Sequence, residues 1–467
     1  MVKMEQTKIK DFESFVDKVM ESYGAQGVAV SIFGKNETYY ENFFGFRDSE
    51  EQIKIDENTI FGMASISKSF TCLAVMQLVE KGIVDLDGLV SDYIPAFSGK
   101  NQKGVRLRHL LSHAAGFFPE KRILVKDIAQ QIGIWDNRQT HDITYNEKLA
   151  AEGIKLVAGR LDSRTKHIGK PGELMSYSND SYGLIADIIG RYGGEGTYSA
   201  YVKKHILEPL EMSRSSLEFE APAKDPNCTQ LYIYRNGKLE ACKDFYDNAF
   251  VLMGGGAMKS SVGDLKKYTR MYLNEGVGSN GKTLLSQYYT REMVKPRQFY
   301  RFQQYYGFGL STKFMDDINV IGHGGSLTGV SNMFQWSPQL ECGIIVFCNT
   351  SDFPAGVIAD AAMRLANNKK IISKRDLFRD TPWSDETLKA ACGLYKSDEG
   401  AVYEITCENG APVVKVNNEA LDIRTVSNDM LLINRPYNKA DLILCRNNNG
   451  EVWGIRTGGR IIPKADN

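Results

Sequence analysis

Ser65 and Lys68 are the first residues whose types and spacing allow chemistry. They stand in Ala64-Ser65-Ile66-Ser67-Lys68, and a mostly apolar run from Thr71 to Lys81 follows before Gly82. This pattern predicts a helix with Ser65 in its first turn, where residues three apart lie on one face. A neighbouring amine can take the serine proton, and the hydroxyl can then attack a carbonyl group.

A serine three residues before a lysine is a weak signal by itself. The same pattern recurs at Ser163–Lys166 and at Ser279–Lys282, and bare motif matches are often false. Ser163 stands among charged residues, and Ser279 stands in a polar turn of glycine and asparagine. Only Ser65 opens a long apolar helix, so the local context favours Ser65 as the nucleophile.

A serine nucleophile also needs a base, an acid and donors for an oxyanion. Lys68 is in place as the base, although a free lysine has a pKa near 10.4 and is protonated at neutral pH. Tyr177 stands on a loop that opens an apolar helix, and its phenol can exchange the proton if nearby positive charge lowers its pKa. The backbone N–H of Ser65, with one from the strand after His323, would form the oxyanion hole.

The signals at Tyr177 and His323 are weak when each is taken alone. Gly324 and Gly325 follow His323 and allow the backbone to approach a substrate closely. The order of these segments does not prove that they meet. The Tyr-x-Asn pattern of Tyr177 recurs elsewhere, at Tyr40, Tyr234, Tyr246 and Tyr272.

Composition argues against several classes of function. The chain has 467 residues, and a prior of about 150 residues per domain predicts two or three domains. Lysine plus arginine and aspartate plus glutamate both number 57, so nothing favours nucleic acid or an anionic membrane as a partner. No apolar run is long enough to span a membrane. The N-terminal residues 1–8 lack an apolar signal core, which predicts a cytoplasmic protein, although a leader removed earlier would leave the same pattern.

Metal and phosphate sites are not predicted. The eight cysteines form no Cys-x-x-Cys pair and are interpreted as free thiols. His109 and His113 are one turn apart, but without a third ligand nearby they are interpreted as structural. Gly254-Gly255-Gly256 lacks the ending of a phosphate-binding loop, so packing or flexibility is its better interpretation.

The elements around these residues alternate between helices and strands. Amphipathic spacing predicts a helix over 5–23. An apolar strand over 27–33, a Gly-Lys-Asn turn and a returning strand over 37–45 predict a hairpin. A second hairpin is predicted over 333–348 and a helix over 354–366. Residues 118–170 are mixed and polar, which indicates short helices and loops with a lid over a cleft as one option.

The texture of the chain changes near Leu388. Short strand-like runs separated by Asn-Gly, Asn-Asn and Gly-Gly pairs replace the helices. Closely spaced hairpins of this kind predict a small antiparallel barrel or sandwich. We therefore expect a first domain over 1–370, a linker over 371–387 and a small all-β domain over 388–467.

Three stretches resemble the motifs of the serine β-lactamase and penicillin-binding-protein superfamily, and in particular its class C β-lactamase-like branch of esterases, D-aminopeptidases and DD-carboxypeptidases. Ser65–Lys68 resembles its Ser-x-x-Lys motif and Tyr177–Asn179 its Tyr-x-Asn motif. His323–Gly325 resembles the His-x-Gly form of its third motif. The order and the wide spacing agree, and the resemblance covers roughly residues 5–366. Two further helical stretches, 108–116 and 255–265, match as well.

The resemblance implies an α+β fold in which an antiparallel sheet flanked by helices meets a helical region, with the cleft between them. It implies that Ser65 is acylated and that Lys68 and Tyr177 share the base and acid roles. It also implies that His323 orients the substrate and tunes Tyr177. The N–H groups of Ser65 and Ser326 would form the oxyanion hole, Asn179 would bind the substrate amide, and no metal or organic cofactor is implied. The substrate-binding positions would be Asn179, Gly324, Gly325 and Ser326.

One departure bears on the substrate. The best-known β-lactamases carry Lys-Thr-Gly where this chain has His323-Gly324-Gly325. A histidine is mostly neutral at neutral pH, which argues against efficient β-lactam hydrolysis and favours esters or peptides. The C-terminal domain resembles the lipocalin-like β-barrel appended to some peptidases of this superfamily. It would either shape substrate entry or mediate homo-oligomerisation.

The resulting hypothesis is a serine hydrolase that acts through an acyl-enzyme on small esters, D-amino-acid peptides or amides, and less efficiently on β-lactams. Two alternatives stay open. One is a protein that binds penicillin or muropeptides without fast turnover, and the other is an acyltransferase. In each case the partner would be a small molecule or a peptide.

Overall fold

The structure is a computed structural model of the chain. It describes residues 4–134, 146–164, 167–218, 225–235, 238–242, 252–372 and 378–465. Lys166 and the middle of the mixed segment 118–170 therefore lie outside the described residues. None of the described helices is long and apolar enough to cross a membrane.

The central element is an eight-stranded antiparallel sheet. Its strand order is β2-β1-β12-β11-β10-β9-β8-β7, so the N-terminal hairpin lies beside strands that come some 300 residues later. The two predicted hairpins are confirmed. The strands are β1 (Gly27–Gly34), β2 (Thr38–Gly45), β7 (Gln298–Arg301), β8 (Gln304–Tyr306), β9 (Ser311–Met315), β10 (Ile318–Leu327), β11 (Val330–Ser337) and β12 (Cys342–Cys348).

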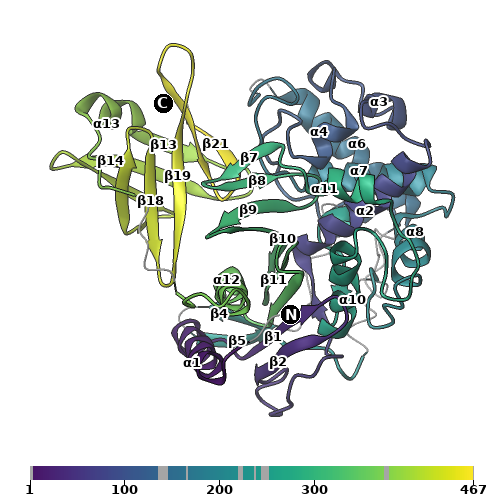
Figure 1. Ribbon diagram of the computed structural model, residues 1–467. Coiled ribbons are helices and arrows are strands. Elements are labelled where there is room, and N and C mark those ends of the chain that lie inside the picture. The colour runs from purple at the N-terminus through teal and green to yellow at the C-terminus, as the bar shows by residue number, and fades with distance from the viewer. Residues whose placement is uncertain are drawn as a thin grey trace.

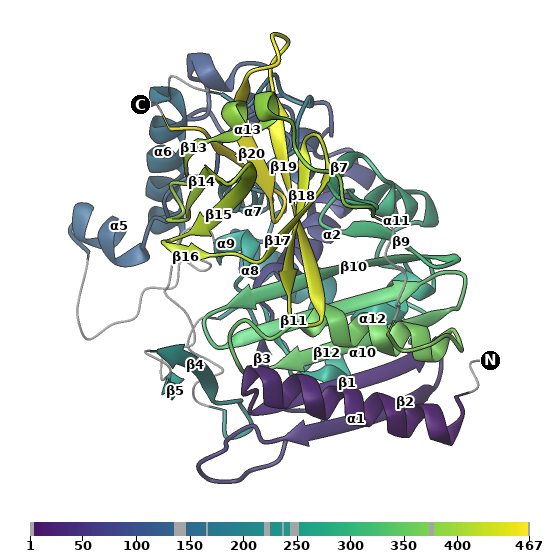
Figure 2. The ribbon, with the colours of Figure 1, turned by 90° about the vertical axis from the view of Figure 1, so that its left-hand side faces the viewer.

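Helices cover both faces of this sheet. Successive side chains of a strand point to opposite faces, so Val28, Val30 and Ile32 pack against α1 and α12. Ala29 and Phe33 face the opposite core, which holds α2 and α10. Figure 2 shows α1 and α12 side by side on one face. These helices are α1 (Gln6–Tyr23), α2 (Ser67–Glu80), α10 (Val262–Leu273) and α12 (Ala355–Ala366).

A helical region lies at the upper right of Figure 1. It includes a long helix, α6, where the sequence indicated only short helices, because charged residues on its outer face mask the apolar stripe that it buries. Two further pairs of short antiparallel strands lie outside the large sheet. The helices are α3 (Val90–Tyr93), α4 (Leu107–Leu111), α5 (Val125–Gln131), α6 (Glu147–Ser163), α7 (Asp180–Tyr192), α8 (Tyr198–Val202), α9 (Leu252–Gly255) and α11 (Gln287–Val294), and the strand pairs are β3 (Phe61–Gly62) with β6 (Lys259–Ser260) and β4 (Leu231–Arg235) with β5 (Lys238–Cys242).

The C-terminal strands form two further antiparallel sheets. One contains β13–β16 and the other β17–β21, and a bridge between Tyr395 and Lys464 joins them at one side. The closed barrel that we expected is not confirmed. In Figure 1 these green and yellow strands lie beside β7 and β8. The elements are α13 (Asp385–Ala391), β13 (Gly393–Lys396), β14 (Val402–Glu408), β15 (Ala411–Val416), β16 (Glu419–Ala420), β17 (Ile423–Ser427), β18 (Met430–Arg435), β19 (Asn438–Arg446), β20 (Val452–Thr457) and β21 (Arg460–Pro463).

Candidate active site

Ser65 lies in a short 3₁₀ turn, Ala64–Ile66, and Lys68 lies in the first turn of α2 that follows it. The Nζ atom of Lys68 is 3.1 Å from the Oγ atom of Ser65, so the predicted pair is in contact. Ala64 has a φ angle of 46°, a left-handed conformation that is costly for a residue with a Cβ. The turn that presents Ser65 therefore stores strain and must be held by its surroundings.

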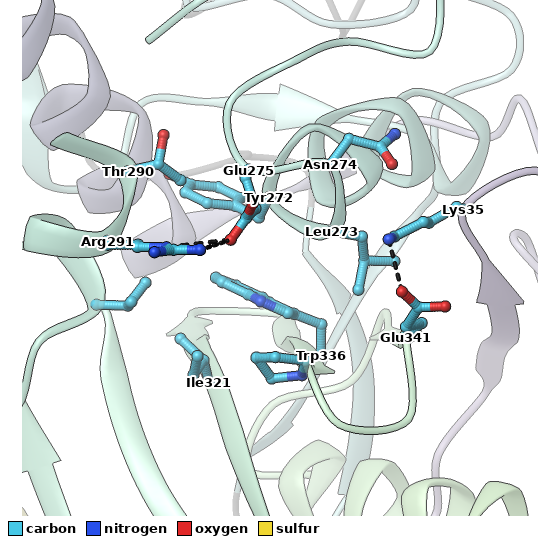
Figure 3. Close-up of a pocket in the computed structure, with 12 residues that line it drawn as sticks. Lys35, Tyr272, Leu273, Asn274, Glu275, Thr290, Arg291, Ile321, Trp336 and Glu341 are labelled. Atoms are coloured by element: carbon cyan, nitrogen blue, oxygen red, sulfur yellow. Dashed lines mark hydrogen bonds and ion pairs between the residues drawn. The ribbon is translucent and has the colours of Figure 1, made fainter. Parts of the chain in front are cut away.

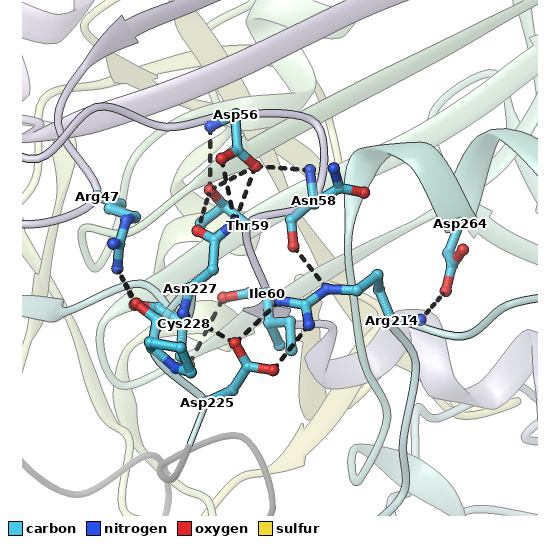
Figure 4. A network of polar contacts seen from close by, with 11 residues as sticks. Arg47, Asp56, Asn58, Thr59, Ile60, Arg214, Asp225, Asn227, Cys228 and Asp264 are labelled. Atoms are coloured by element: carbon cyan, nitrogen blue, oxygen red, sulfur yellow. Dashed lines mark hydrogen bonds and ion pairs between the residues drawn. The ribbon is translucent and has the colours of Figure 1, made fainter.

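A polar network holds the segment that leads to this turn (Figure 4). The N–H of Ile60 donates to the carbonyl of Asn227 at 2.9 Å. The Asn227 amide donates to both carboxylate oxygens of Asp56, at 3.0 and 3.1 Å. Arg214 binds Asp225 through two nitrogens at 2.7 and 3.0 Å. Such a two-point pair fixes direction as well as distance, so residues 56–60 cannot shift easily.

The glycine triplet packs beside α2, as interpreted from the sequence. A Cβ on Gly254 would lie 2.3 Å from the carbonyl oxygen of Tyr182, so only glycine fits there. Thr71 donates to the Gly254 carbonyl at 2.6 Å, and the Gly255 carbonyl lies 2.8 Å from Nζ of Lys68. The triplet thus also supplies a contact to the candidate base, which the sequence did not reveal.

Lys68 is fully buried and its three polar contacts define its chemistry. Nζ reaches Oδ1 of Asn179 at 2.9 Å and the Gly255 carbonyl at 2.8 Å, in addition to Ser65. Burial, and then the positive charge of Arg460, holds the pKa of Lys68 well below its usual value. A neutral amine can donate its two hydrogens to the two carbonyl oxygens, which leaves its lone pair for the Ser65 proton.

Tyr177 lies close to Lys68, whose Nζ atom is 4.9 Å from the centre of the Tyr177 ring. Burial raises the pKa of the Tyr177 phenol well above its usual value, while a hydrogen bond with Ser65 acts in the opposite direction. The positive charge of Arg460 does lower this pKa, as expected for a nearby cation, but burial outweighs it. The phenol instead stays protonated at neutral pH, so it suits the role of acid.

His323 points to a tyrosine other than the expected one. Its Nε2 lies 3.0 Å from the hydroxyl of Tyr306 and its Nδ1 lies 2.6 Å from the Gly324 carbonyl. Burial, followed by the charge of Lys68, lowers the pKa of His323 to about 3. The ring is therefore neutral, and its Nδ1–H donates to Gly324 while Nε2 accepts from Tyr306. Its ring centre is 6.2 Å from that of Tyr177.

His113 is the histidine that contacts Tyr177. Their ring centres are 4.2 Å apart, and Nδ1 of His113 accepts the N–H of Ser178 at 3.1 Å. Burial, and then Lys68, keeps the pKa of His113 well below its usual value. These contacts agree with the structural role predicted for His113. The segment that His113 holds is the loop that carries Tyr177. No group of three or more metal-ligating side chains occurs among the described residues.

Strand β10 carries the third predicted segment against the nucleophile turn. A Cβ on Gly325 would lie 2.1 Å from the Met63 carbonyl oxygen, whereas one on Gly324 would first meet the Met333 methyl at 3.2 Å. Gly325 is therefore the glycine that the close approach requires. Ser326 follows on the same strand and is exposed. That the backbone N–H of Ser326 is the second donor to the oxyanion stays a prediction.

Two C-terminal residues that sequence reasoning missed complete this region. The guanidinium carbon of Arg460 lies 5.0 Å from the ring centre of Tyr177. Arg460 forms an ion pair with Glu399, and Glu399 accepts from the Asn179 amide at 3.3 Å. Neither residue stands in a motif, since an arginine after a Gly-Gly turn and a glutamate in a loop are ordinary features of a small β domain.

A pocket of about 530 Å³ lies apart from Ser65, Lys68, Tyr177 and His323, none of which lines it (Figure 3). Trp336 and Tyr272 line it and stack on each other, with ring centres 4.7 Å apart. An ion pair between Arg291 and Glu275 lines it. Among the described residues that line it there is no serine or cysteine, and the hydroxyl of Thr290 donates to the Ser286 carbonyl at 2.9 Å.

Comparisons with known proteins agree with the family resemblance of the motif segments. A family model described as Beta-lactamase matches residues 12–368. A penicillin-binding protein of Bacillus subtilis (strain 168) is 28% identical over 212 residues, 45% of this chain and 42% of that protein. The mitochondrial serine beta-lactamase-like protein LACTB of Homo sapiens is 26% identical over 307 residues, 56% of this chain and 55% of that protein. The chain thus spans about half the length of these curated relatives.

Two solved structures match nearly the whole chain. The octameric penicillin-binding protein homologue from Pyrococcus abyssi has a TM-score of 0.67 and 25% identity, and the match covers 97% of this chain and 99% of that one. The crystal structure of SurE has a TM-score of 0.72 at 18% identity and covers 98% and 99%. The second match establishes the shared fold alone. Both matches extend through the C-terminal sheets.

Proposed function

The chain belongs to the beta-lactamase family, and we propose that it is a serine hydrolase that forms an acyl-enzyme on Ser65. The observation that carries this proposal is the contact of 3.1 Å between Ser65 Oγ and Lys68 Nζ. Two carbonyl oxygens take the hydrogens of Lys68, and burial favours its neutral form. Such an amine acts as a general base.

The proposed reaction has two halves. Lys68 takes the proton of Ser65, and the serine oxygen bonds to the substrate carbonyl carbon while the carbonyl electrons move to oxygen. The N–H groups of Ser65 and Ser326 stabilise that oxyanion. The Tyr177 phenol protonates the departing group, the carbonyl reforms, and the proton on Lys68 returns to the phenolate. Water then attacks the ester by the same route, which releases the acid and frees Ser65.

We further propose that the substrates are small esters, D-amino-acid peptides or amides, with β-lactams hydrolysed more slowly. The pKa of about 3 for His323 supports this order, since a neutral ring offers no cation where the best-known β-lactamases have a lysine. We also propose that Asn179 binds a substrate amide; its amide nitrogen now donates to Glu399 and its oxygen accepts from Lys68.

A fluorescent fluorophosphonate tests the nucleophile directly. We expect one covalent adduct by intact mass on the wild type and on Ser279→Ala, and none on Ser65→Ala. Ser279 is the matched control, because it also precedes a lysine by three residues but is exposed in a turn. Turnover of a chromogenic ester that survives in Ser65→Ala would overturn the proposal.

Turnover separates the alternatives. A chromogenic ester or β-lactam that releases one equivalent of product per Ser65 and then stops would favour a binding protein without fast turnover. Product transferred to an added amine or alcohol would favour an acyltransferase.

We also propose that the chain forms homo-oligomers, which the octameric Pyrococcus abyssi homologue supports. Light scattering after size-exclusion chromatography tests this proposal. A mass of one chain at all concentrations would contradict it.

A further inference from the structure

We propose that Arg460 binds a carboxylate group of the substrate, so that the C-terminal sheets form part of the substrate-binding site. The proposal rests on the acyl-enzyme function of Ser65 proposed above. It assigns the substrate a chemical class, an acyl donor that carries a negative charge near the scissile bond.

The backbone around Arg460 is clamped to the loop of the candidate acid. On one side, the Gly459 carbonyl accepts the N–H of Tyr177 at 2.9 Å. On the other side, the N–H of Ile461 donates to Oγ of Ser176 at 3.0 Å. Gly459 has a φ angle of 78°, and a Cβ there would lie 2.1 Å from the Tyr300 ring. The fold thus holds Arg460 at this place with little freedom.

Arg460 is the permanent cation that contacts Tyr177. Burial lowers the pKa values of Lys68, His113 and His323 and so disfavours their charged forms, whereas an arginine stays charged. Its guanidinium lies over the Tyr177 ring. Arg301 lies one ring further out, where it donates to the Tyr300 hydroxyl at 3.2 Å. Of these two arginines, Arg460 is thus the one that contacts Tyr177 itself.

Glu399 shows that a carboxylate fits beside Arg460. Nε and Nη2 of Arg460 donate to the Glu399 carboxylate, and Nη1 takes no part in this pair. Glu399 also accepts the Asn179 amide hydrogen at 3.3 Å. If a substrate amide accepts this hydrogen instead, Glu399 loses its bond to Asn179. The carboxylate of the substrate can then reach the guanidinium of Arg460. Glu399 thus competes with the substrate for Arg460.

This competition predicts opposite effects for the two partners. The readout is kcat/KM for two p-nitrophenyl esters whose acyl chains end in a carboxylate or in an isosteric carboxamide. We expect Arg460→Met to lower the ratio of carboxylate to carboxamide by about tenfold or more, because a charge-assisted hydrogen bond is lost. Arg460→Lys should restore part of the ratio. Glu399→Gln should raise it, because the competing anion is removed.

The controls separate recognition from folding and from catalysis. Arg301→Met, which removes the more distant cation, should leave the ratio nearly as in the wild type. If Arg460→Met still forms the fluorophosphonate adduct and its ratio of kcat/KM values equals that of the wild type, the carboxylate proposal is overturned and the proposed hydrolase function stands. A ratio that falls in Glu399→Gln would indicate that Glu399 binds a substrate cation, which also overturns it. Absence of the adduct in the wild type would instead overturn the proposed function. If Arg460→Met fails to fold, Arg460→Lys and Glu399→Gln still decide the proposal.

Discussion

Burial sets the protonation of the two groups that handle the proton, and it acts on them in opposite directions. It lowers the pKa of the cationic acid Lys68 and raises that of the neutral acid Tyr177, because in both cases the charged form loses solvation. Burial therefore favours the neutral form of both groups. Lys68 can accept a proton and Tyr177 can give one, without a further cofactor in the proposed steps.

The pH dependence follows from Lys68. The wild-type kcat/KM should fall as the pH drops through the lowered pKa of Lys68, since protonation removes the base. A histidine of ordinary pKa would give its own limb near 6.5, but His323 has a pKa of about 3 and stays neutral from pH 5 to 8. The pH profiles of kcat/KM for the wild type and for His323→Gln should therefore have the same midpoint in the acid limb assigned to Lys68. A limb that disappears in His323→Gln would contradict this assignment.

Asp180 offers a prediction for stability. It is buried next to Asn179, and its Oδ1 has no hydrogen-bond partner among the described residues. Burial, then the charges of Glu120 and Glu399, raises its pKa to about 7. A folded pKa above the unfolded one means that its stabilising contribution is present at low pH and lost as the pH rises through 7.

Asp180→Asn should remove this dependence. Between pH 5 and 8, the free energy of unfolding of the wild type should fall relative to the variant by on the order of 2 kcal/mol. Urea denaturation at both pH values measures the difference. Parallel changes in wild type and variant would show that the Asp180 carboxyl does not titrate in this range.

At the scale of elements, the sequence predicted the helices and hairpins that form between residues close together in the chain. An apolar strand followed by a glycine turn predicted the β1–β2 hairpin, and an apolar run predicted α2. The three motif segments were found because each has its own spacing, and the structure brings them together. Arg460 and Glu399 could not be found in this way, because their role arises from a tertiary contact with Tyr177 and Asn179.

The pair Gly324 and Gly325 tests the approach of β10 to the nucleophile turn. Gly325→Ala places a methyl group 2.1 Å from the backbone oxygen of Met63, so the strand or the turn must move. A displacement near 1 Å at a reacting group costs about 100-fold in rate. We therefore expect the rate at which the fluorophosphonate labels Ser65 to fall by about that factor. Gly324→Ala is the control, since it meets only the flexible Met333 methyl. Equal labelling rates in both variants would contradict the close approach.

At the scale of the whole molecule, an apolar seam joins the C-terminal sheets to the helical region. Ile461 is 1% exposed and packs with Phe118 and Ile168. Arg164 adds ion pairs to Glu120, at 2.7 Å, and to Asp398 across the same seam. The residue before Ile461 is Arg460, so the packing of this seam sets the position of the guanidinium over Tyr177.

Ile461→Ala should therefore affect both stability and substrate binding. The cavity should cost about 2–5 kcal/mol, and relaxation into it should move Arg460 and raise KM several-fold for a carboxylate substrate. Ile405→Ala is the matched control, because Ile405 is also 1% exposed but belongs to the inner core of the C-terminal sheets. It should lower Tm by a similar amount and leave KM near the wild-type value at room temperature. Similar KM values in the two variants, at similar losses of Tm, would show that the C-terminal sheets stabilise the chain without shaping its substrate site.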